Sequence, residues 1–315
     1  MPAANDPGAA PPRRLVHLSD PHLSVPSRPS GAARRGKQVL GYWSWHRRRR
    51  HVHQRPLLDA LAADVRSQRA DQVVVTGDLT QIGQPDEFRQ AAGWLQALGP
   101  PDQVTIVPGN HDAYVPGCLD NGMELLRDYL PDGGAAAAWP RLRRVGPLLL
   151  IGLSSAVPAS ALTATGTLGG PQLQALDHAL AMGTEQGLCR VLLVHHPIAP
   201  GQVRWRKRLT DATALARLLR LRGAELVLHG HAHRRQRYTV PGPHGPVPVL
   251  GAASASALDA RHGRAASYHL IDISGQPGNW QCMLSVRASD GGGRFVTVQA
   301  PQALSGNAVA GAALS

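Results

Sequence analysis

The sequence is poor in cysteine and aromatic residues and has no long apolar run. Its three cysteines, Cys118, Cys189 and Cys282, lie far apart without a C-x-x-C pair. This spacing argues against a disulfide framework or a structural zinc site made by cysteines, and it favours a reducing compartment. No stretch approaches the ~18 apolar residues of a membrane span, and the N-terminus has no continuous apolar segment of the signal-peptide type. We therefore expect a cytoplasmic protein, either free or peripheral to the inner membrane.

The two ends of the chain have a different composition from its centre. Residues 1–12 (MPAANDPGAAPP) and the Ala-, Gly- and Ser-rich residues 299–315 have the composition of loose tails. Hydrophobic residues make up 43% of the 315-residue chain, which is enough to bury a sizeable core. We expect one folded domain over residues 13–298.

The positive charge of the chain is concentrated near its start. The formal net charge is +12, and residues 13–55 alone contain eleven Lys or Arg against one acid, Asp20. The rest of the chain after Arg55 is close to neutral. The high isoelectric point therefore describes one local basic segment and not a basic protein.

Short apolar runs alternate with helical patterns along most of the chain. The strand candidates are residues 15–19, 72–76, 103–107, 148–153, 190–194 and 225–228, and the helix candidates are residues 56–69, 86–98, 119–130, 171–182 and 211–221. Such alternation predicts an α/β layered domain. After Pro246 the pattern changes to strands and turns, at residues 247–252, 268–273 and 280–286, which could complete a second sheet.

Polar side chains follow five of the apolar runs. They are Asp20 and His22, Asp78, Asn110 with His111 and Asp112, His195, and finally His231 and His233. The carboxyl ends of strands in open α/β sheets line the ligand crevice. Glycines at 77, 109 and 230 would let these turns bend so that the side chains converge.

These residue types suit a pair of metal ions. Two divalent ions ~3.5–4 Å apart need a bridging ligand and mixed nitrogen and oxygen donors. A carboxylate can bridge them through its two oxygens, and Asp78 is the candidate. Imidazoles suit Zn, Fe, Mn or Ni ions better than Mg or Ca. The identity of the two ions stays open.

The five segments resemble the motif blocks of the calcineurin-like metallophosphoesterase superfamily. Its blocks D-x-H, G-D, G-N-H-[DE], H and G-H-x-H occur here in the same order over about residues 14–240. The resemblance implies an α/β fold, a two-layer β-sandwich flanked by helices, with a dinuclear metal centre at its edge. It implies that Asp20, His22 and His233 hold the first ion, that Asn110, His195 and His231 hold the second, and that Asp78 bridges both.

The same resemblance assigns roles around the ions. His111 corresponds to the histidine near the substrate that protonates the leaving group or stabilises charge, and Asp112 would orient it. His17, His196 and His229 have no place among the ligands. His229 is expected to be structural, and His17 and His196 are expected either to be structural or to support the ligands from behind. A non-enzymatic scaffold would have gaps in the ligand set, and none of the seven implied ligands is missing.

The implied activity is hydrolysis of a phosphodiester or pyrophosphate bond by a metal-activated water. The wording "HLSDPHLS", "TGDLT", "GNHD", "HHPI" and "HGHAH" is most similar to the bacterial branch of class III cyclic-nucleotide phosphodiesterases. That branch also includes glycerophosphodiesterases and lipid-precursor pyrophosphatases, so a nucleotide-sugar lipid at the membrane surface is the alternative substrate. A protein phosphatase would normally carry an Arg after the G-N-H-E block, where this chain has Ala and Tyr.

Two basic segments interleave Trp with Arg or Lys. One is the insertion at residues 36–55 and the other lies at residues 203–211. One interpretation is a solvated basic surface with structural Trp residues. The other is a substrate rim that meets an anionic membrane surface or a nucleic acid. The rim candidates are Trp43, Trp45, Arg47, Arg48, Arg49, Arg50, Arg204 and Arg206.

Overall fold

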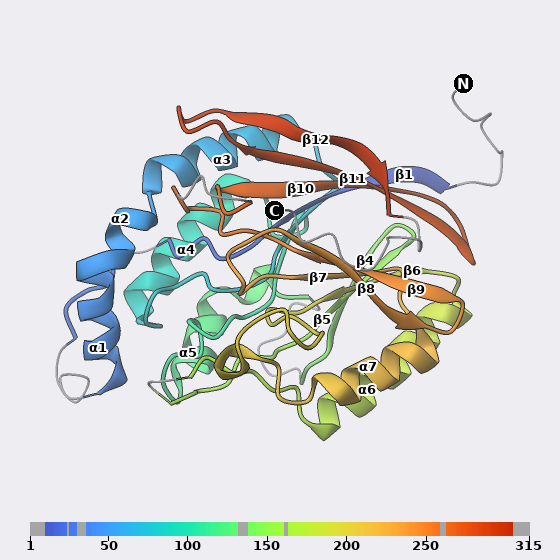
Figure 1. The fold of residues 1–315 in the computed structure, drawn as a ribbon, viewed down its shortest axis with the longest axis horizontal. Helices are drawn as coiled ribbons and strands as arrows, with labels where there is room; N and C mark the ends of the chain where they lie inside the picture. The colour runs from blue at the N-terminus through green and yellow to red at the C-terminus, as the bar shows by residue number, and fades with distance from the viewer. Residues whose placement is uncertain are drawn as a thin grey trace.

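Two six-stranded sheets pack face to face and carry helices on their outer surfaces, as Figure 1 shows. The computed structural model describes residues 10–23, 25–29, 36–131, 138–160, 163–258 and 263–304. Between the sheets lies a buried cluster that includes Leu15, Val74, Leu150, Val191 and Leu228. The expected β-sandwich flanked by helices is confirmed.

The first sheet combines parallel strands at its centre with an antiparallel edge. Its order is β12 (Phe295–Ala303), β11 (Asn279–Ser289), β10 (Ser267–Gln276), β1 (Ala10–Leu18), β2 (Gln72–Val75) and β3 (Val104–Ile106). Strands β1, β2 and β3 are parallel, and β10 pairs antiparallel with β1.

Both ends of this sheet extend beyond the expected domain bounds. Residues 10–12 belong to β1, where Ala10 pairs with Gly275, and residues 299–303 belong to β12, where Ala303 pairs with Met283. Ladder pairing therefore orders residues that composition alone assigned to tails. Residues 1–9 and 305–315 lie outside the described residues.

The second sheet has the order β4 (Arg141–Val145), β5 (Leu148–Gly152), β6 (Cys189–Leu193), β7 (Leu226–His229), β9 (Gly245–Gly251) and β8 (Gln236–Gly242). Strands β5, β6, β7 and β9 are parallel. The expectation that the three late strands could complete a second sheet is right for β9 and wrong for β10 and β11, which extend the first sheet beside β1. The edge strand β12 was not among the expected strands.

Helices cover the outer face of each sheet. α3 (Arg55–Ser67) and α4 (Pro85–Leu98) pack on the first sheet, and α6 (Gly170–Glu185) and α7 (Ala212–Arg222) lie together on the second. α5 (Cys118–Leu125) follows β3. The basic insertion forms α1 (Lys37–Ser44), a π-helical segment (Trp45–Arg49) and the short α2 (Arg50–Val52), which continue one another toward α3 in Figure 1.

Helix α4 shows how the sequence fixes one of these elements. Pro85 occupies its first turn, where a missing N–H group costs nothing. The Glu87 side chain accepts a hydrogen bond from the Gln84 N–H in a capping box. Phe88 and Trp94 lie on its buried face, and both are almost completely shielded from solvent.

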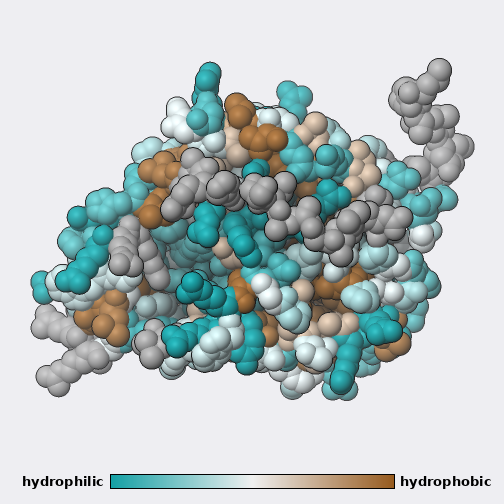
Figure 2. Space-filling view, in the orientation of Figure 1, coloured by the Kyte–Doolittle hydropathy of each residue, from teal (hydrophilic) through white to brown (hydrophobic). Residues whose placement is uncertain are grey.

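Among the described residues, no helix is both long and apolar enough to cross a bilayer. On the face drawn in Figure 2, hydrophobic residues form separate patches between hydrophilic ones.

Candidate metal centre

Five loops meet at one edge of the sandwich. They follow β1, β2 and β3 of the first sheet and β6 and β7 of the second, so the parallel strands of both sheets deliver their carboxyl ends to the same place. The loops also bond to one another, since the N–H groups of Asp20 and His22 donate to the carbonyls of Gly77 and Asp78 at 3.0 and 3.1 Å. The convergence expected from the sequence is therefore present.

Most of the converging residues have a left-handed backbone. The φ angles of Asp20, His22, Asp78, His231 and His233 are 51°, 43°, 56°, 67° and 50°. Non-glycine residues rarely adopt such values, and they concentrate at functional sites where the surroundings enforce them.

Two glycines permit the loops to approach closely. A Cβ atom on Gly109 would lie 2.3 Å from the Asp78 nitrogen, and one on Gly230 would lie 1.8 Å from Ser19 Oγ. Both distances are far below van der Waals contact. These positions require glycine because of close packing between loops, a reason that complements the bending expected from the sequence.

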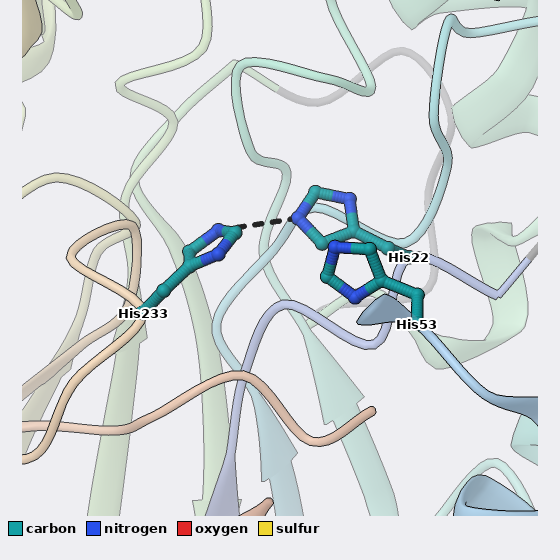
Figure 3. Close-up of side chains that lie close together, drawn as sticks. All are labelled: His22, His53 and His233. Atoms are coloured by element: carbon teal, nitrogen blue, oxygen red, sulfur yellow. Dashed lines mark hydrogen bonds between the residues drawn. The ribbon is translucent and has the colours of Figure 1, made fainter. Parts of the chain in front are cut away.

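One group of metal donors consists of Asp20, His22, Asp78 and His233. His22 Nε2 lies 3.2 Å from His233 Nε2, and Figure 3 shows these two rings facing each other. His233 Nε2 lies 3.1 Å from Asp20 Oδ1, and His22 Nε2 lies 3.8 Å from Asp78 Oδ2. These are the residues that the sequence assigned to the first ion, together with the bridging carboxylate.

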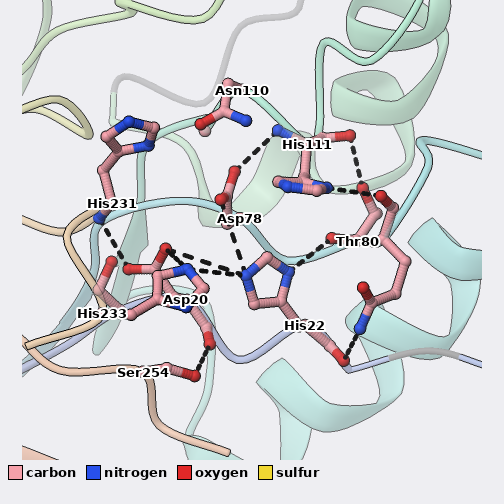
Figure 4. Close-up of polar contacts among 12 residues, drawn as sticks. Asp20, His22, Asp78, Thr80, Asn110, His111, His231, His233 and Ser254 are labelled. Carbon is pink, nitrogen blue, oxygen red and sulfur yellow. Dashed lines mark hydrogen bonds and ion pairs between the residues drawn. The ribbon is translucent and has the colours of Figure 1, made fainter. Parts of the chain in front are cut away.

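A second group consists of Asp78, His195 and His231, with Asn110 beside them. His195 Nε2 lies 3.4 Å from Asp78 Oδ2, 3.1 Å from Asn110 Oδ1 and 3.2 Å from His231 Nδ1. Asp78 is therefore common to both groups, and it lies between them in Figure 4. All seven residues that the sequence proposed as ligands lie together.

The tautomers of two histidines suit a cation at this place. His22 Nδ1 donates to the Thr80 carbonyl at 3.1 Å, and His195 Nδ1 donates to the Thr76 carbonyl at 2.7 Å. Because a carbonyl only accepts, each Nδ1 carries the proton, and whenever the ring is neutral its Nε2 presents a lone pair to the centre. Lone pairs and carboxylate oxygens at these separations fit divalent ions.

The pKa values of His195 and Asp78 show that each group stabilises the charged form of the other. Although burial lowers it, the neighbouring Asp78 carboxylate raises the pKa of His195 to about 9. Burial also opposes ionisation of Asp78, yet His195 and His111 hold the pKa of its carboxyl well below the usual value. The Asp78 carboxylate thus favours positive charge on its neighbours.

His111 and Asp112 are adjacent in sequence but have different hydrogen-bond partners. The His111 N–H donates to Asp78 Oδ1 at 2.8 Å, its ring Nδ1 donates to the Gln81 carbonyl at 2.5 Å, and the residue lines the cleft. Asp112 accepts from the backbone N–H groups of Thr80 and Gly109 at 3.0 and 2.8 Å. Asp112 therefore fixes the two loops, and the Gln81 carbonyl orients the His111 ring.

Asp112 is itself unusual in its titration. Burial and the Asp78 carboxylate raise the pKa of Asp112 to about 7. The Thr80 hydroxyl lies 3.0 Å from both Asp112 Oδ1 and the His111 carbonyl, so it links the two residues indirectly.

A cleft of about 490 Å³ opens over the donor groups. It is lined by His22, Lys37, Val52, His53, Asp78, Asn110, His111, Tyr114, Thr163, Ala164, Arg204, Arg206, Lys207, His231 and His233. Of the rim candidates, Arg204 and Arg206 line it, whereas Trp43, Trp45, Arg47 and Arg50 lie on the insertion outside the lining. The side chains of Arg48 and Arg49 lie outside the described residues.

The sequence did not single out Lys37, His53, Tyr114 and Lys207, which also line the cleft. Lys37 and Lys207 were visible only as members of basic runs, and no motif marks His53 or Tyr114.

The three histidines without a ligand role lie behind the centre. His17 contacts Thr76 Oγ1 at 3.0 Å, His196 contacts Ser155 Oγ at 2.7 Å, and His229 contacts the Tyr238 hydroxyl at 3.1 Å. Burial lowers the pKa of all three. These contacts fit the roles expected for them.

Comparison with known sequences gives a family match over most of the chain. The sequence profile of the calcineurin-like phosphoesterases matches residues 13–235. A cAMP/cGMP dual specificity phosphodiesterase of Mycobacterium tuberculosis is 28% identical over 242 residues, which cover 76% of this chain and 66% of that protein. A probable cyclic nucleotide phosphodiesterase of Rhodococcus erythropolis is 27% identical over 246 residues, covering 76% of this chain and 70% of that one.

Solved structures share the fold at much lower identity. A dimetal phosphatase from Danio rerio superposes with a TM-score of 0.58 at 13% identity, covering 91% of this chain and 98% of that one. A purple acid phosphatase from yellow lupin gives the same TM-score and identity, covering 91% of this chain and 53% of that one.

Proposed function

This chain belongs to the calcineurin-like phosphoesterase family, and from that premise we propose that it hydrolyses a phosphodiester or pyrophosphate bond at a dinuclear metal centre. The observation that carries the proposal is the sharing of Asp78 by two groups of donors. Asp20, His22 and His233 would complete one ion site, and Asn110, His195 and His231 the other. Two divalent ions there would acidify a water and polarise phosphoryl oxygens.

The residues of the chain then divide the remaining work. His111 lines the cleft, and the Gln81 carbonyl accepts a hydrogen bond from its Nδ1. The other ring nitrogen, Nε2, would therefore give a proton to the leaving oxygen. Lys37, Arg204, Arg206 and Lys207 line the same cleft and would attract and orient a phosphate group. Asp112 would act as a positioning residue for both ligand loops.

A cyclic nucleotide is the first substrate candidate. The two bacterial relatives named above are a cAMP/cGMP phosphodiesterase and a probable cyclic nucleotide phosphodiesterase. The cleft of about 490 Å³ is also within the size range of small-molecule sites. The second candidate is a nucleotide-sugar lipid pyrophosphate, which would use the basic residues of the cleft for its second phosphate.

The test is a substrate panel with defined metals. The protein is stripped by a chelator and reloaded with Mn²⁺, Fe²⁺ or Zn²⁺, and turnover is measured on bis-p-nitrophenyl phosphate, cyclic AMP, cyclic GMP and a lipid-linked pyrophosphate. We expect diester hydrolysis that requires transition-metal ions. Full activity after exhaustive chelation would contradict the proposed centre.

We propose in addition that the insertion contacts an anionic membrane surface. Leu40, Trp43 and Val52 are exposed large hydrophobic residues on α1 and α2, and the Arg47 guanidinium lies 5.8 Å from the Trp43 ring centroid. Exposed aliphatic side chains beside Trp and Arg suit a lipid interface better than a nucleic acid. A cytoplasmic location, with peripheral contact of this kind, agrees with the free thiols of the three cysteines.

The membrane proposal is tested by vesicle binding. Changing Arg47 and Arg50 to Ser removes two positive charges, each worth ~1 kcal/mol near an acidic bilayer, so partitioning should fall about thirtyfold. The control changes Arg217 and Arg220, which are exposed on α7, to Ser. Equal binding of both variants, or no binding by the unmodified protein, would leave the insertion as a solvated surface.

A further inference from the structure

His53 enters the cleft from the end of the basic insertion. Its backbone is fixed on the segment that follows β9, since Leu258 N–H donates to the Val52 carbonyl and Gln54 N–H donates to the Ser256 carbonyl, both at 3.1 Å. His53 itself forms an isolated antiparallel bridge with Ala257. The half-buried ring therefore lines the cleft from a position set by main-chain bonds.

The ring lies against two of the proposed ligands. The candidate ligand atoms of His22, His53 and His233 all lie within 4.8 Å of one another. The ring centroid of His53 is 4.6 Å from that of His22 and 6.0 Å from that of His233. Figure 3 shows the three imidazoles gathered in this way.

The nitrogen that His53 offers follows from its support. Nδ1 lies 2.6 Å from Ser256 Oγ, so Nε2 is the ligand atom directed at the cluster. Ser256 Oγ lies 3.3 Å from Ser254 Oγ, which donates to the Asp20 carbonyl at 2.7 Å. A hydrogen bond that fixes the remote ring nitrogen is typical of a metal-binding histidine, and here it connects His53 to the loop of another ligand.

From these contacts we infer that His53 is an additional imidazole ligand of the ion held by His22 and His233. The inference rests on the proposed metal centre and adds a residue that lies outside the seven ligands implied by the family motifs. A third imidazole makes this ion site richer in nitrogen than Asp20, His22, Asp78 and His233 alone. Such a donor set favours Zn²⁺ over the oxygen-preferring Mn²⁺.

The test measures metal binding without turnover. The affinities of the intact protein for Zn²⁺ and Mn²⁺ are compared by competition with a chromophoric chelator, and the Co²⁺-loaded protein gives an absorption spectrum sensitive to ligand number. We expect His53→Ala to weaken Zn²⁺ at one of the two sites at least about tenfold, to weaken Mn²⁺ less, and to alter the Co²⁺ spectrum.

Matched variants separate ligation from folding. His51→Ala removes an exposed histidine from the same segment and should change neither affinity nor spectrum. His53→Gln keeps most of the side-chain volume, and it decides the question if His53→Ala fails to fold. Ser256→Ala should give a smaller loss of Zn²⁺ affinity than His53→Ala.

The outcomes distinguish this inference from the proposed function. Two ions in the unmodified protein, with Zn²⁺ affinity and Co²⁺ spectrum unchanged in both His53 variants, would overturn the inference and leave the dinuclear centre standing. An unmodified protein that binds no divalent ion would overturn both.

Discussion

Replacing Gly109 with Ala should displace the bridging carboxylate without changing any proposed ligand. The added Cβ would lie 2.3 Å from both the nitrogen and Oδ1 of Asp78, which is about 1.1 Å closer than an ordinary contact of 3.4 Å. The obstructing atoms include backbone, which cannot rotate away. A displacement of ~1 Å at a reacting centre lowers turnover about 10²-fold.

The assay pairs metal content with turnover. Metal stoichiometry is measured by mass spectrometry, turnover is measured on bis-p-nitrophenyl phosphate, and thermal unfolding follows the fold. We expect Gly109→Ala to bind fewer than two ions and to lose about 10²-fold in kcat. The control is Gly93→Ala in α4, where a Cβ meets nothing within 4 Å and the helix should gain about 0.5–1 kcal/mol.

Two results would refute this reasoning. One is a Gly109→Ala protein with two ions and near-normal turnover, which would show that the Asp78 loop accommodates the methyl group. The other is an equal loss in Gly93→Ala, which would trace the effect to the fold as a whole.

Three further predictions concern single side chains. Asp78→Asn should lose more metal and more turnover than Asp20→Asn, because only Asp78 belongs to both donor groups; equal losses would contradict a bridging role. His111→Ala should keep both ions and lose about 10²–10⁴-fold in turnover, with the smaller loss on substrates with good leaving groups such as p-nitrophenolate; the same loss on good and poor leaving groups would argue against proton donation. Burial lowers the pKa of His269 to about 3, so only the unfolded chain takes up this proton below its ordinary value of about 6.5. The contribution of His269 to the free energy of unfolding should therefore be fully present above pH 6.5 and should fall by about 1.4 kcal/mol per pH unit below it. Urea titrations at pH 7.5 and 5.5 should show that stability depends less on pH in His269→Gln than in the unmodified protein. The same pH dependence in both proteins would contradict this assignment.

The sequence predicted the strands that carry the metal donors better than the strands at the sheet edges. β2, β6 and β7 are fully buried and mostly apolar, which gives a clear signal in the sequence. β4 (Arg141–Val145) is half-exposed and contains three arginines, and β12 exposes most of its residues. β4 and β12 therefore give little apolar signal because they are exposed at sheet edges. β3 also lies at an edge, but it is buried, and the sequence predicted it.

The candidate donor residues could be found because each lies two to four residues after the end of a strand. His53 shows the opposite case, since it reaches the centre only because the insertion folds back on the segment around Ser256 and Ala257. Nothing in the spacing of His51, Val52 and His53 indicates that return. Contacts between segments some two hundred residues apart are a property of the fold and are absent from local pattern.

The left-handed backbone of the metal donors has a consequence for how such a chain would change over generations. Five of the six described non-glycine residues with positive φ belong to the two donor groups, the sixth being Arg69. Each such conformation costs of order 1–3 kcal/mol. Aspartate and histidine adopt it more readily than most non-glycine residues, but the cost still falls on the positions that the proposed chemistry requires. Relaxed selection on catalysis would favour glycine or asparagine at positions 20, 22, 78, 231 and 233, because these residues adopt positive φ most readily. Descendants that kept the fold and abandoned the reaction would thus gain stability from glycine or asparagine at these five positions.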